Sequence, residues 1–116
     1  MISSILNYPN PFSTSTRFVY TLTGNEPPAF FKIQIMTVSG RIVREITQDE
    51  IGPLRTGTHT TDYAWDGTDE FGDRLANGVY LYRVTAQKSD GTAFEAIQTG
   101  ADAFIQKGFG KMVLVR

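Results

Sequence analysis

The chain has 116 residues, of which 41% are hydrophobic and 20% are charged, and its net charge is −1. These values are typical of one globular domain over residues 1–116 and exclude a chain that is intrinsically disordered. The balance of 11 basic and 12 acidic residues gives no electrostatic basis for binding nucleic acid. Because there is no cysteine, disulfides, thiolate metal sites and a cysteine nucleophile are excluded.

The two ends of the sequence carry expectations about a parent protein. Met1 to Leu6 lack the basic start and long apolar run of a secretory signal, so an export signal would lie elsewhere. The abrupt start favours a fragment of a larger protein. At the other end, Arg116 directly follows an expected strand, which fits a natural C-terminus.

Apolar residues alternate with a period of two along most of the chain, the spacing typical of strands, and helical periodicity is nearly absent. The expected strands cover residues 18–22, 31–35, 41–46, 61–65, 79–86, 92–98 and 111–115. Ser39-Gly40 and Ser89-Asp90-Gly91 are turn signals that predict two hairpins. The strand 79–86 begins with apolar residues on both faces and is therefore expected at the centre of a sheet.

Seven or eight short strands separated by turns predict an antiparallel β-sandwich. The core between its two sheets is expected to contain Phe18, Tyr20, Ile33, Ile35, Trp65, Tyr80 and Tyr82. Residues 99–110 have no clear pattern and could form a long loop or an added short element.

The loop after Trp65 concentrates four acidic residues, Asp66, Asp69, Glu70 and Asp73. Clustered carboxylates suit a hard cation such as calcium, but this spacing is not that of a helix-loop-helix calcium site. Aspartates also accept hydrogen bonds from backbone N–H groups in turns. We predict a structural turn between two strands, with no metal and no other cofactor, and keep a bound cation as the alternative.

Little in the sequence points to catalysis. His59 is the only histidine and is interpreted as a surface residue, because acid–base work needs a positioned partner and a pocket. No serine lies in a nucleophile elbow, and no glycine-rich phosphate loop precedes a helix. We therefore predict no catalytic and no cofactor-binding residues, and a protein that is not an enzyme. Phe12, Phe71 and Phe109 either form a docking patch or, as we favour, plug the ends of the sandwich.

Several motifs occur in the order found in a known family. In chain order they are Asn7-Tyr8-Pro9-Asn10-Pro11-Phe12, Thr16-Arg17-Phe18, Ile33-Gln34-Ile35, Ser39-Gly40-Arg41-Ile42-Val43-Arg44, Trp65-Asp66-Gly67, Phe71-Gly72, Ala76-Asn77-Gly78-Val79-Tyr80-Leu81-Tyr82-Arg83 and Lys111-Met112-Val113-Leu114-Val115-Arg116. Over nearly its whole length the chain resembles the Ig-like C-terminal domain shared by cargo of the bacterial type IX secretion system and by flagellar hook-capping proteins. The resemblance implies an all-β, Ig-like sandwich.

For a type IX cargo domain, the resemblance implies a signal at the C-terminus of a larger exported protein. The protein would pass through the periplasm to the outer membrane, the cell surface or the medium. Its partners would be outer-membrane β-barrel shuttle and translocon proteins and the type IX sortase, with no nucleic acid. Recognition in such families lies in the last strands, so the candidate residues are Gly78, Tyr80, Lys111, Met112, Val113, Leu114 and Val115. An exposed terminal strand could also swap between copies and give a dimer.

The chain departs from common cargo domains by its longer segment 87–110. That segment is similar to the C-terminal domain of the type IX sortase, which keeps its domain and docks by it to an outer-membrane barrel. A retained docking domain and a structural scaffold of the hook-cap type are therefore the alternatives to a sorting signal. A carbohydrate-binding module is less favoured, because the tyrosines alternate into the expected core.

Overall fold

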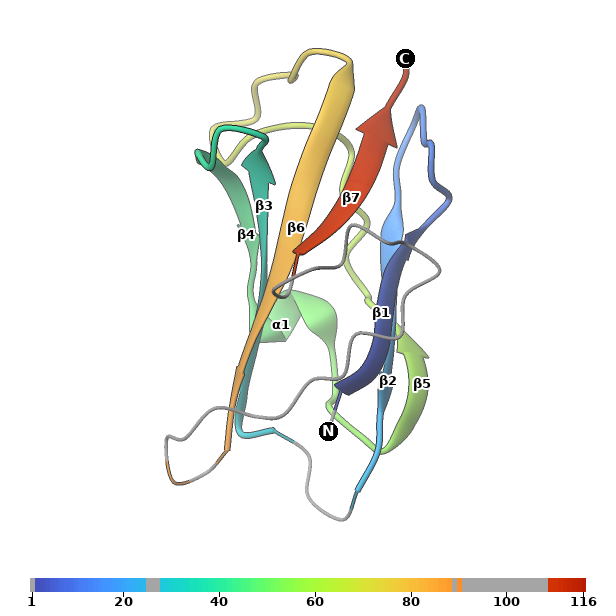
Figure 1. The fold of residues 1–116 in the computed structure, drawn as a ribbon, viewed down its shortest axis with the longest axis vertical. Coiled ribbons are helices and arrows are strands. Elements are labelled where there is room, and N and C mark those ends of the chain that lie inside the picture. The colour runs from blue at the N-terminus through green and yellow to red at the C-terminus, as the bar shows by residue number, and fades with distance from the viewer. Residues whose placement is uncertain (1, 25–27, 89, 91–108) are drawn as a thin grey trace.

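A computed structural model describes residues 2–24, 28–88, 90 and 109–116, which form two antiparallel sheets packed face to face (Figure 1). One sheet has three strands in the order β1-β2-β5, and the other has four in the order β4-β3-β6-β7. The elements are β1 (Ile2–Tyr8), β2 (Arg17–Leu22), β3 (Phe30–Thr37), β4 (Ile42–Ile46), α1 (Gln48–Ile51), β5 (Gly57–Thr60), β6 (Gly78–Gln87) and β7 (Phe109–Leu114). The predicted Ig-like β-sandwich is confirmed, with seven strands in this part of the chain.

The alternation of apolar residues fills the space between the sheets. All seven side chains predicted for the core are buried, each less than 8% exposed. The Phe18 ring of the three-stranded sheet meets Tyr82 of the four-stranded sheet edge-on, with ring centres 5.0 Å apart. Aromatic pairs in this geometry add to the free energy of simple burial. The periodicity of the sequence therefore predicts the core correctly.

The hairpin and the central strand are also confirmed. β3 joins β4 through a tight turn in which the Gly40 N–H donates to the Thr37 carbonyl oxygen at 2.9 Å. β6 lies between β3 and β7, as its apolar start predicts. The second expected hairpin, at Ser89-Asp90-Gly91, falls on residues of which only Asp90 is described, and the expected strand 92–98 and most of segment 99–110 lie outside the described residues.

The prediction of a strand over 61–65 is wrong in its regular form. Among the described residues, this segment pairs with β2 and the residue before it only at its ends, where Thr61 bonds Phe18 and Trp65 exchanges two backbone bonds with Thr16. Between them, the N–H groups of residues 62 and 63 donate to the carbonyl oxygens of Ile51 and Glu50, which belong to α1. The segment therefore turns towards the helix and does not extend a sheet.

Three elements were not predicted: β1, α1 and β5, which ends just before the expected strand 61–65. β1 has only a weak alternation in sequence and is held by its pairing with β2. α1 is a single turn, and its signal in the sequence is the capping box of Thr47 and Glu50. The backbone N–H and the hydroxyl of Thr47 donate to the Glu50 carboxylate at 3.1 and 3.3 Å. None of the helices among the described residues is long and apolar enough to cross a bilayer.

Candidate functional site: the last strand and its supports

The last strand, β7, brings most of the candidate recognition residues to one place. It pairs with β6 in an antiparallel register that sets Met112 opposite Tyr80 and Leu114 opposite Gly78. Met112 and Leu114 are fully buried, whereas Lys111 and Val113 are half-exposed and face away from the core. Alternation along the strand thus separates core side chains from outward ones.

The predicted recognition residues therefore fall into two groups. The Tyr80 side chain lies in the core, where its hydroxyl donates to the Ala76 carbonyl oxygen at 2.6 Å. Of the rest, Lys111 and Val113 face outward and Val115, just beyond the strand, is 51% exposed. That these residues bind a partner stays a prediction, but only the outward group offers side chains to one.

The outer edge of β7 is occupied by the segment Asn10–Phe12. The Phe12 N–H donates to the Val113 carbonyl oxygen at 3.0 Å, and the Val115 N–H donates to the Phe12 carbonyl oxygen at 2.9 Å. The Asn10 side-chain amide acts as one more peptide group, because it donates to the Lys111 carbonyl at 3.1 Å and accepts from the Val113 N–H at 3.0 Å. This segment, which we call the edge clamp, bonds the outward N–H and C=O groups of β7 that a partner strand would need for pairing.

The three phenylalanines outside the expected strands have different surroundings. Phe12 is 2% exposed and packs on Trp65, with ring centres 5.5 Å apart, so its predicted role as a plug is confirmed. Phe109 is half-buried in β7, and the guanidinium of Arg83 lies 5.5 Å from its ring centre. Phe71 is 81% exposed, so the prediction that it closes an end of the sandwich is wrong.

The acidic loop after Trp65 is a structured turn. The Asp69 carboxylate accepts bonds from the N–H groups of Phe71 and Asp73, both at 2.9 Å. The Thr68 hydroxyl donates to the Asp66 carboxylate at 2.6 Å. These oxygens satisfy the loop's own donors, which is the structural interpretation of the sequence. Within the described ranges, the acidic and histidine side chains form no group of three that could hold a metal ion.

The same loop holds the end of the terminal strand. The Arg116 guanidinium donates to the carbonyl oxygens of Asp66 and Gly67 at 3.1 and 2.9 Å, and a further bond reaches Leu75. Gly67 has a φ of +79°, and a Cβ there would lie 2.9 Å from the Leu114 side chain. A glycine at this position therefore lets the last strand approach the loop closely.

Sequence reasoning missed the side chains that support β7. Asn10, Asn77 and Arg116 bond the strand or the residues beside it, and Asn77 pairs with the backbone of Arg116 through both amide atoms. In the sequence, Asn10 stands between prolines and Asn77 precedes a glycine, so both have the appearance of local turn residues. Their partners lie 39 to 103 residues away, a separation that no local pattern reveals.

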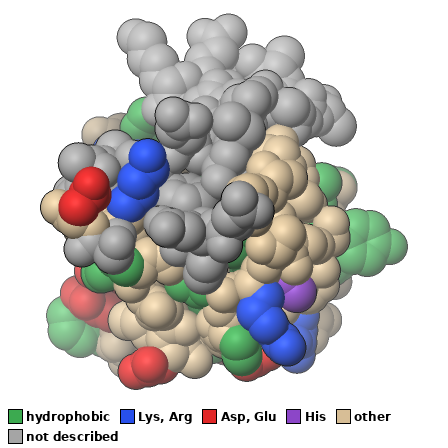
Figure 2. All heavy atoms as spheres, turned by 90° about the horizontal axis from the view of Figure 1, so that it is seen from below, with side chains coloured by type: hydrophobic (Ala, Val, Ile, Leu, Met, Phe, Trp, Pro, Cys, Tyr) green, Lys and Arg blue, Asp and Glu red, His purple; other side chains and the backbone are tan. Residues whose placement is uncertain are grey.

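His59 has no arrangement for acid–base chemistry. It is half-exposed in β5, its ring lies 5.9 Å from that of Tyr20, and its Nε2 is 3.3 Å from the Thr56 carbonyl oxygen. Burial, followed by the nearby Asp62 carboxylate, raises the pKa of Tyr20. Figure 2 looks at one end of the molecule, where the described charged side chains of both signs are dispersed and form no broad patch.

The outward face of the four-stranded sheet carries a polar network across three strands. Lys32 of β3 and Glu45 of β4 form an ion pair at 3.2 Å. The Gln34 amide nitrogen donates to the same carboxylate at 2.7 Å, and its oxygen accepts two bonds from Arg83 of β6. The bond from Gln34, followed by that from Lys32, lowers the pKa of Glu45.

Comparisons with known proteins agree with this architecture. The sequence profile described as the FlgD Ig-like domain matches residues 10–90. The fold is similar to part of a solved structure, the crystal structure of dimeric latent PorU from Porphyromonas gingivalis, with 22% sequence identity and a TM-score of 0.65. The match covers 96% of this chain, which spans 9% of the length of that protein. No curated protein is significantly similar in sequence.

Proposed function

Because this chain belongs to the family of FlgD Ig-like domains, we propose that it is the C-terminal signal domain of a larger exported protein. It directs that protein across the bacterial outer membrane by type IX secretion, through recognition by outer-membrane components, and on to the cell surface. The ordered motifs of the sequence support this role, as does the fold likeness to PorU, a type IX sortase. The role is recognition and not catalysis.

One observation carries the proposal most directly: β7 presents outward side chains on a strand whose backbone is already satisfied. Lys111 and Val113 project from the sheet, and the edge clamp closes the strand's outer edge. A receptor would therefore bind a preformed surface of side chains. Addition of a partner strand would first have to displace at least four hydrogen bonds and the buried ring of Phe12.

The retained docking domain of a type IX sortase is a second candidate, favoured by the fold likeness that covers 96% of this chain. In that case the domain stays attached and anchors its parent to an outer-membrane barrel. A structural scaffold of the hook-cap type is a third, favoured by the family itself. Scaffold use predicts self-association of the chain, which sedimentation velocity measures, whereas the two docking roles do not require it.

A reporter fusion tests the proposal. An export signal and a fluorescent protein are placed before this chain, in a bacterium with type IX secretion and in a mutant that lacks it. Fluorescence at the surface or in the medium of the first strain alone is expected. A product shortened by the mass of the domain indicates a cleaved signal, and a full-length one a retained domain. Periplasmic retention in both strains contradicts the sorting role.

Truncation is a poor test of the same idea. Removing residues 111–116 deletes Met112 and Leu114, which are fully buried, and large-to-small changes at such positions cost about 2–5 kcal/mol each. The truncated chain would fail to fold, and its retention would say nothing about recognition. Substitutions at the outward positions of β7 avoid this difficulty.

A further inference from the structure

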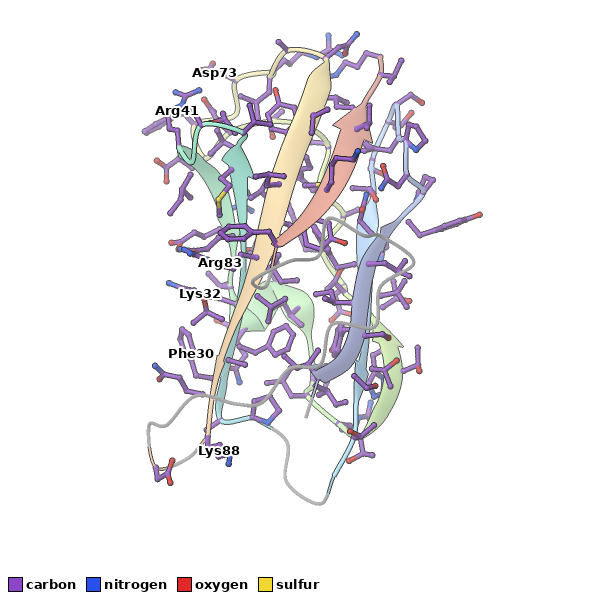
Figure 3. All side chains as sticks on the ribbon, viewed as in Figure 1. Phe30, Lys32, Arg41, Asp73, Arg83 and Lys88 are labelled. Atoms are coloured by element: carbon purple, nitrogen blue, oxygen red, sulfur yellow. The ribbon has the colours of Figure 1, made fainter. Side chains whose placement is uncertain are left out.

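Basic side chains gather on the outward face of the four-stranded sheet. The alternation that buries Ile33, Tyr82 and Met112 directs Lys32, Arg83 and Lys111 to the opposite face, each from a different strand. Figure 3 shows Lys32 and Arg83 on the side of the sheet that faces away from the other sheet. We call these three residues the basic row. Glu45 of β4 lies on the same face and pairs with Lys32, so Arg83 and Lys111 give the described strand residues of this face a net positive charge.

Within the basic row, Arg83 is held in place by hydrogen bonds and by a contact with an aromatic ring. Its Nη2 and Nε donate to the Gln34 amide oxygen at 2.6 and 3.2 Å, and its guanidinium lies 5.5 Å from the ring centre of Phe109. Gln34 is itself only 7% exposed, and its nitrogen is bound to the Glu45 carboxylate. The chain Glu45–Gln34–Arg83 therefore sets the orientation of the guanidinium before any partner arrives.

Among the described residues, no carboxylate forms an ion pair with Arg83. Glu45 is the nearest member of its network with a negative charge, but that carboxylate pairs with Lys32 at 3.2 Å. In the ranges that the structure describes, the two ion pairs are Lys32–Glu45 and Arg44–Glu50, so no carboxylate lies within 4.0 Å of Arg83. Gln34 occupies the side of the guanidinium formed by Nε and Nη2. At the other end of the guanidinium, Nη1 and Nη2 have the geometry to donate one hydrogen bond to each oxygen of a carboxylate.

Apolar side chains continue this face towards the end of the sheet where β6 begins. Val79 and Leu81 of β6 stand opposite Val113 and Lys111 of β7. Val79 is 40% exposed, and Ile42 of β4 is 46% exposed. An exposed apolar surface beside a fixed cationic group is the combination expected of a protein-docking face.

We propose that this face binds an acidic, extended segment of a partner protein, with one carboxylate on the terminal nitrogens of Arg83 and apolar side chains on Val79 and Val113. The inference rests on the proposed docking function and gives the chemistry of its partner. A protein segment fits better than an anionic lipid surface, because a single oriented fork recognises one planar carboxylate, and Val79 and Val113 provide apolar contacts further along the same two strands. Lipid binding would draw on several mobile basic residues.

A peptide titration tests the inference on the chain itself. The probe is the acetylated, amidated pentapeptide Val-Glu-Leu-Glu-Val, and its Gln analogue is the neutral control. In NMR spectra the Arg83 Nε–H and the methyl groups of Val79 and Val113 should shift with the acidic peptide and not with the neutral one. Equal shifts with both peptides, or none with either, would overturn the inference.

Variants connect the signal to Arg83. Arg83→Gln should weaken binding of the acidic peptide at least about tenfold, and Arg83→Lys, which keeps the charge and removes the fork, should lose most of the affinity as well. Arg55→Gln is the matched control, because Arg55 is exposed and lies just before β5, in the other sheet. Unfolding curves show that each variant is folded. Binding of anionic phosphatidylglycerol vesicles that depends on Arg83, without peptide binding, would replace the protein partner by a lipid surface.

The reporter fusion separates this inference from the proposed function. If the wild-type domain and Arg83→Gln are exported equally, the inference fails and the sorting role stands. If the wild-type domain is not exported at all, the sorting role fails, and the peptide titration alone decides the docking face. We expect export of wild type and of Arg55→Gln, with Arg83→Gln retained.

Discussion

Asn10→Ala is the sharpest test of how the terminal strand is held. The substitution removes the side-chain amide that donates to the Lys111 carbonyl at 3.1 Å and accepts from the Val113 N–H at 3.0 Å. Each intramolecular hydrogen bond contributes a net 0.5–1.5 kcal/mol or so, and water can rehydrate the freed groups at this exposed position. We therefore expect a loss of about 1–2 kcal/mol in the free energy of unfolding, or a melting temperature lower by roughly 4–8 °C.

Amide hydrogen exchange shows whether the loss is local. Val113 should exchange about tenfold faster in Asn10→Ala, because 1.4 kcal/mol of lost protection corresponds to a factor of ten. Asn77→Ala is the matched control, since Asn77 makes two comparable bonds with the backbone of Arg116. That variant should leave the exchange of Val113 nearly unchanged. If Asn10→Ala alters neither stability nor Val113 exchange, the edge clamp does not close β7 in solution.

Three further predictions concern the core, the charged network and the acidic loop. Gly110→Ala should destabilise the fold by about 1–3 kcal/mol in chemical denaturation, because a Cβ at Gly110 would overlap the Tyr82 ring; an unchanged midpoint would contradict the packing of β7 on β6. The pKa of Glu45 lies below its ordinary 4.5, so its contribution to stability is present above that pH and is lost as the pH falls through the lower, folded value. The stability difference between wild type and Glu45→Gln should therefore shrink from pH 6 to pH 3, and a constant difference would refute the assignment. The melting temperature should be the same in calcium and in EDTA, since Asp69 and Asp66 bond their own loop, whereas a rise with calcium would indicate a bound cation.

Periodicity predicted the parts of the fold that depend on burial alone. Phe31, Ile33 and Ile35 alternate with the polar Lys32 and Gln34. Because successive side chains of a strand face opposite ways, such a pattern has one way to bury its apolar set. The turn at Ser39-Gly40 could be predicted equally well, since its hydrogen bond joins residues within the turn itself. The path of segment 61–65 could not be predicted in this way, because its backbone N–H groups bond carbonyl oxygens of α1, an element of one turn.

The candidate site was predictable only as a region. The motifs pointed to β6 and β7, but which residues face outward depends on the register that sets Tyr80 opposite Met112. The edge clamp and the contacts of Arg116 join residues far apart in sequence, through amide and guanidinium groups that serve many roles. The fixed orientation of Arg83 likewise requires Gln34 and Glu45 from two other strands, a juxtaposition that exists only after folding.

The measurement that tests the central claim most directly is surface export of the reporter fusion carrying Lys111→Gln with Val113→Thr. Both positions face outward on β7, so the pair removes one positive charge and one methyl group without touching the core. Thr58→Gln on the exposed face of β5 is the control. Our account predicts that the control reaches the cell surface as wild type does and that the β7 variant stays in the periplasm. Export of the β7 variant at the wild-type level would contradict recognition through this strand.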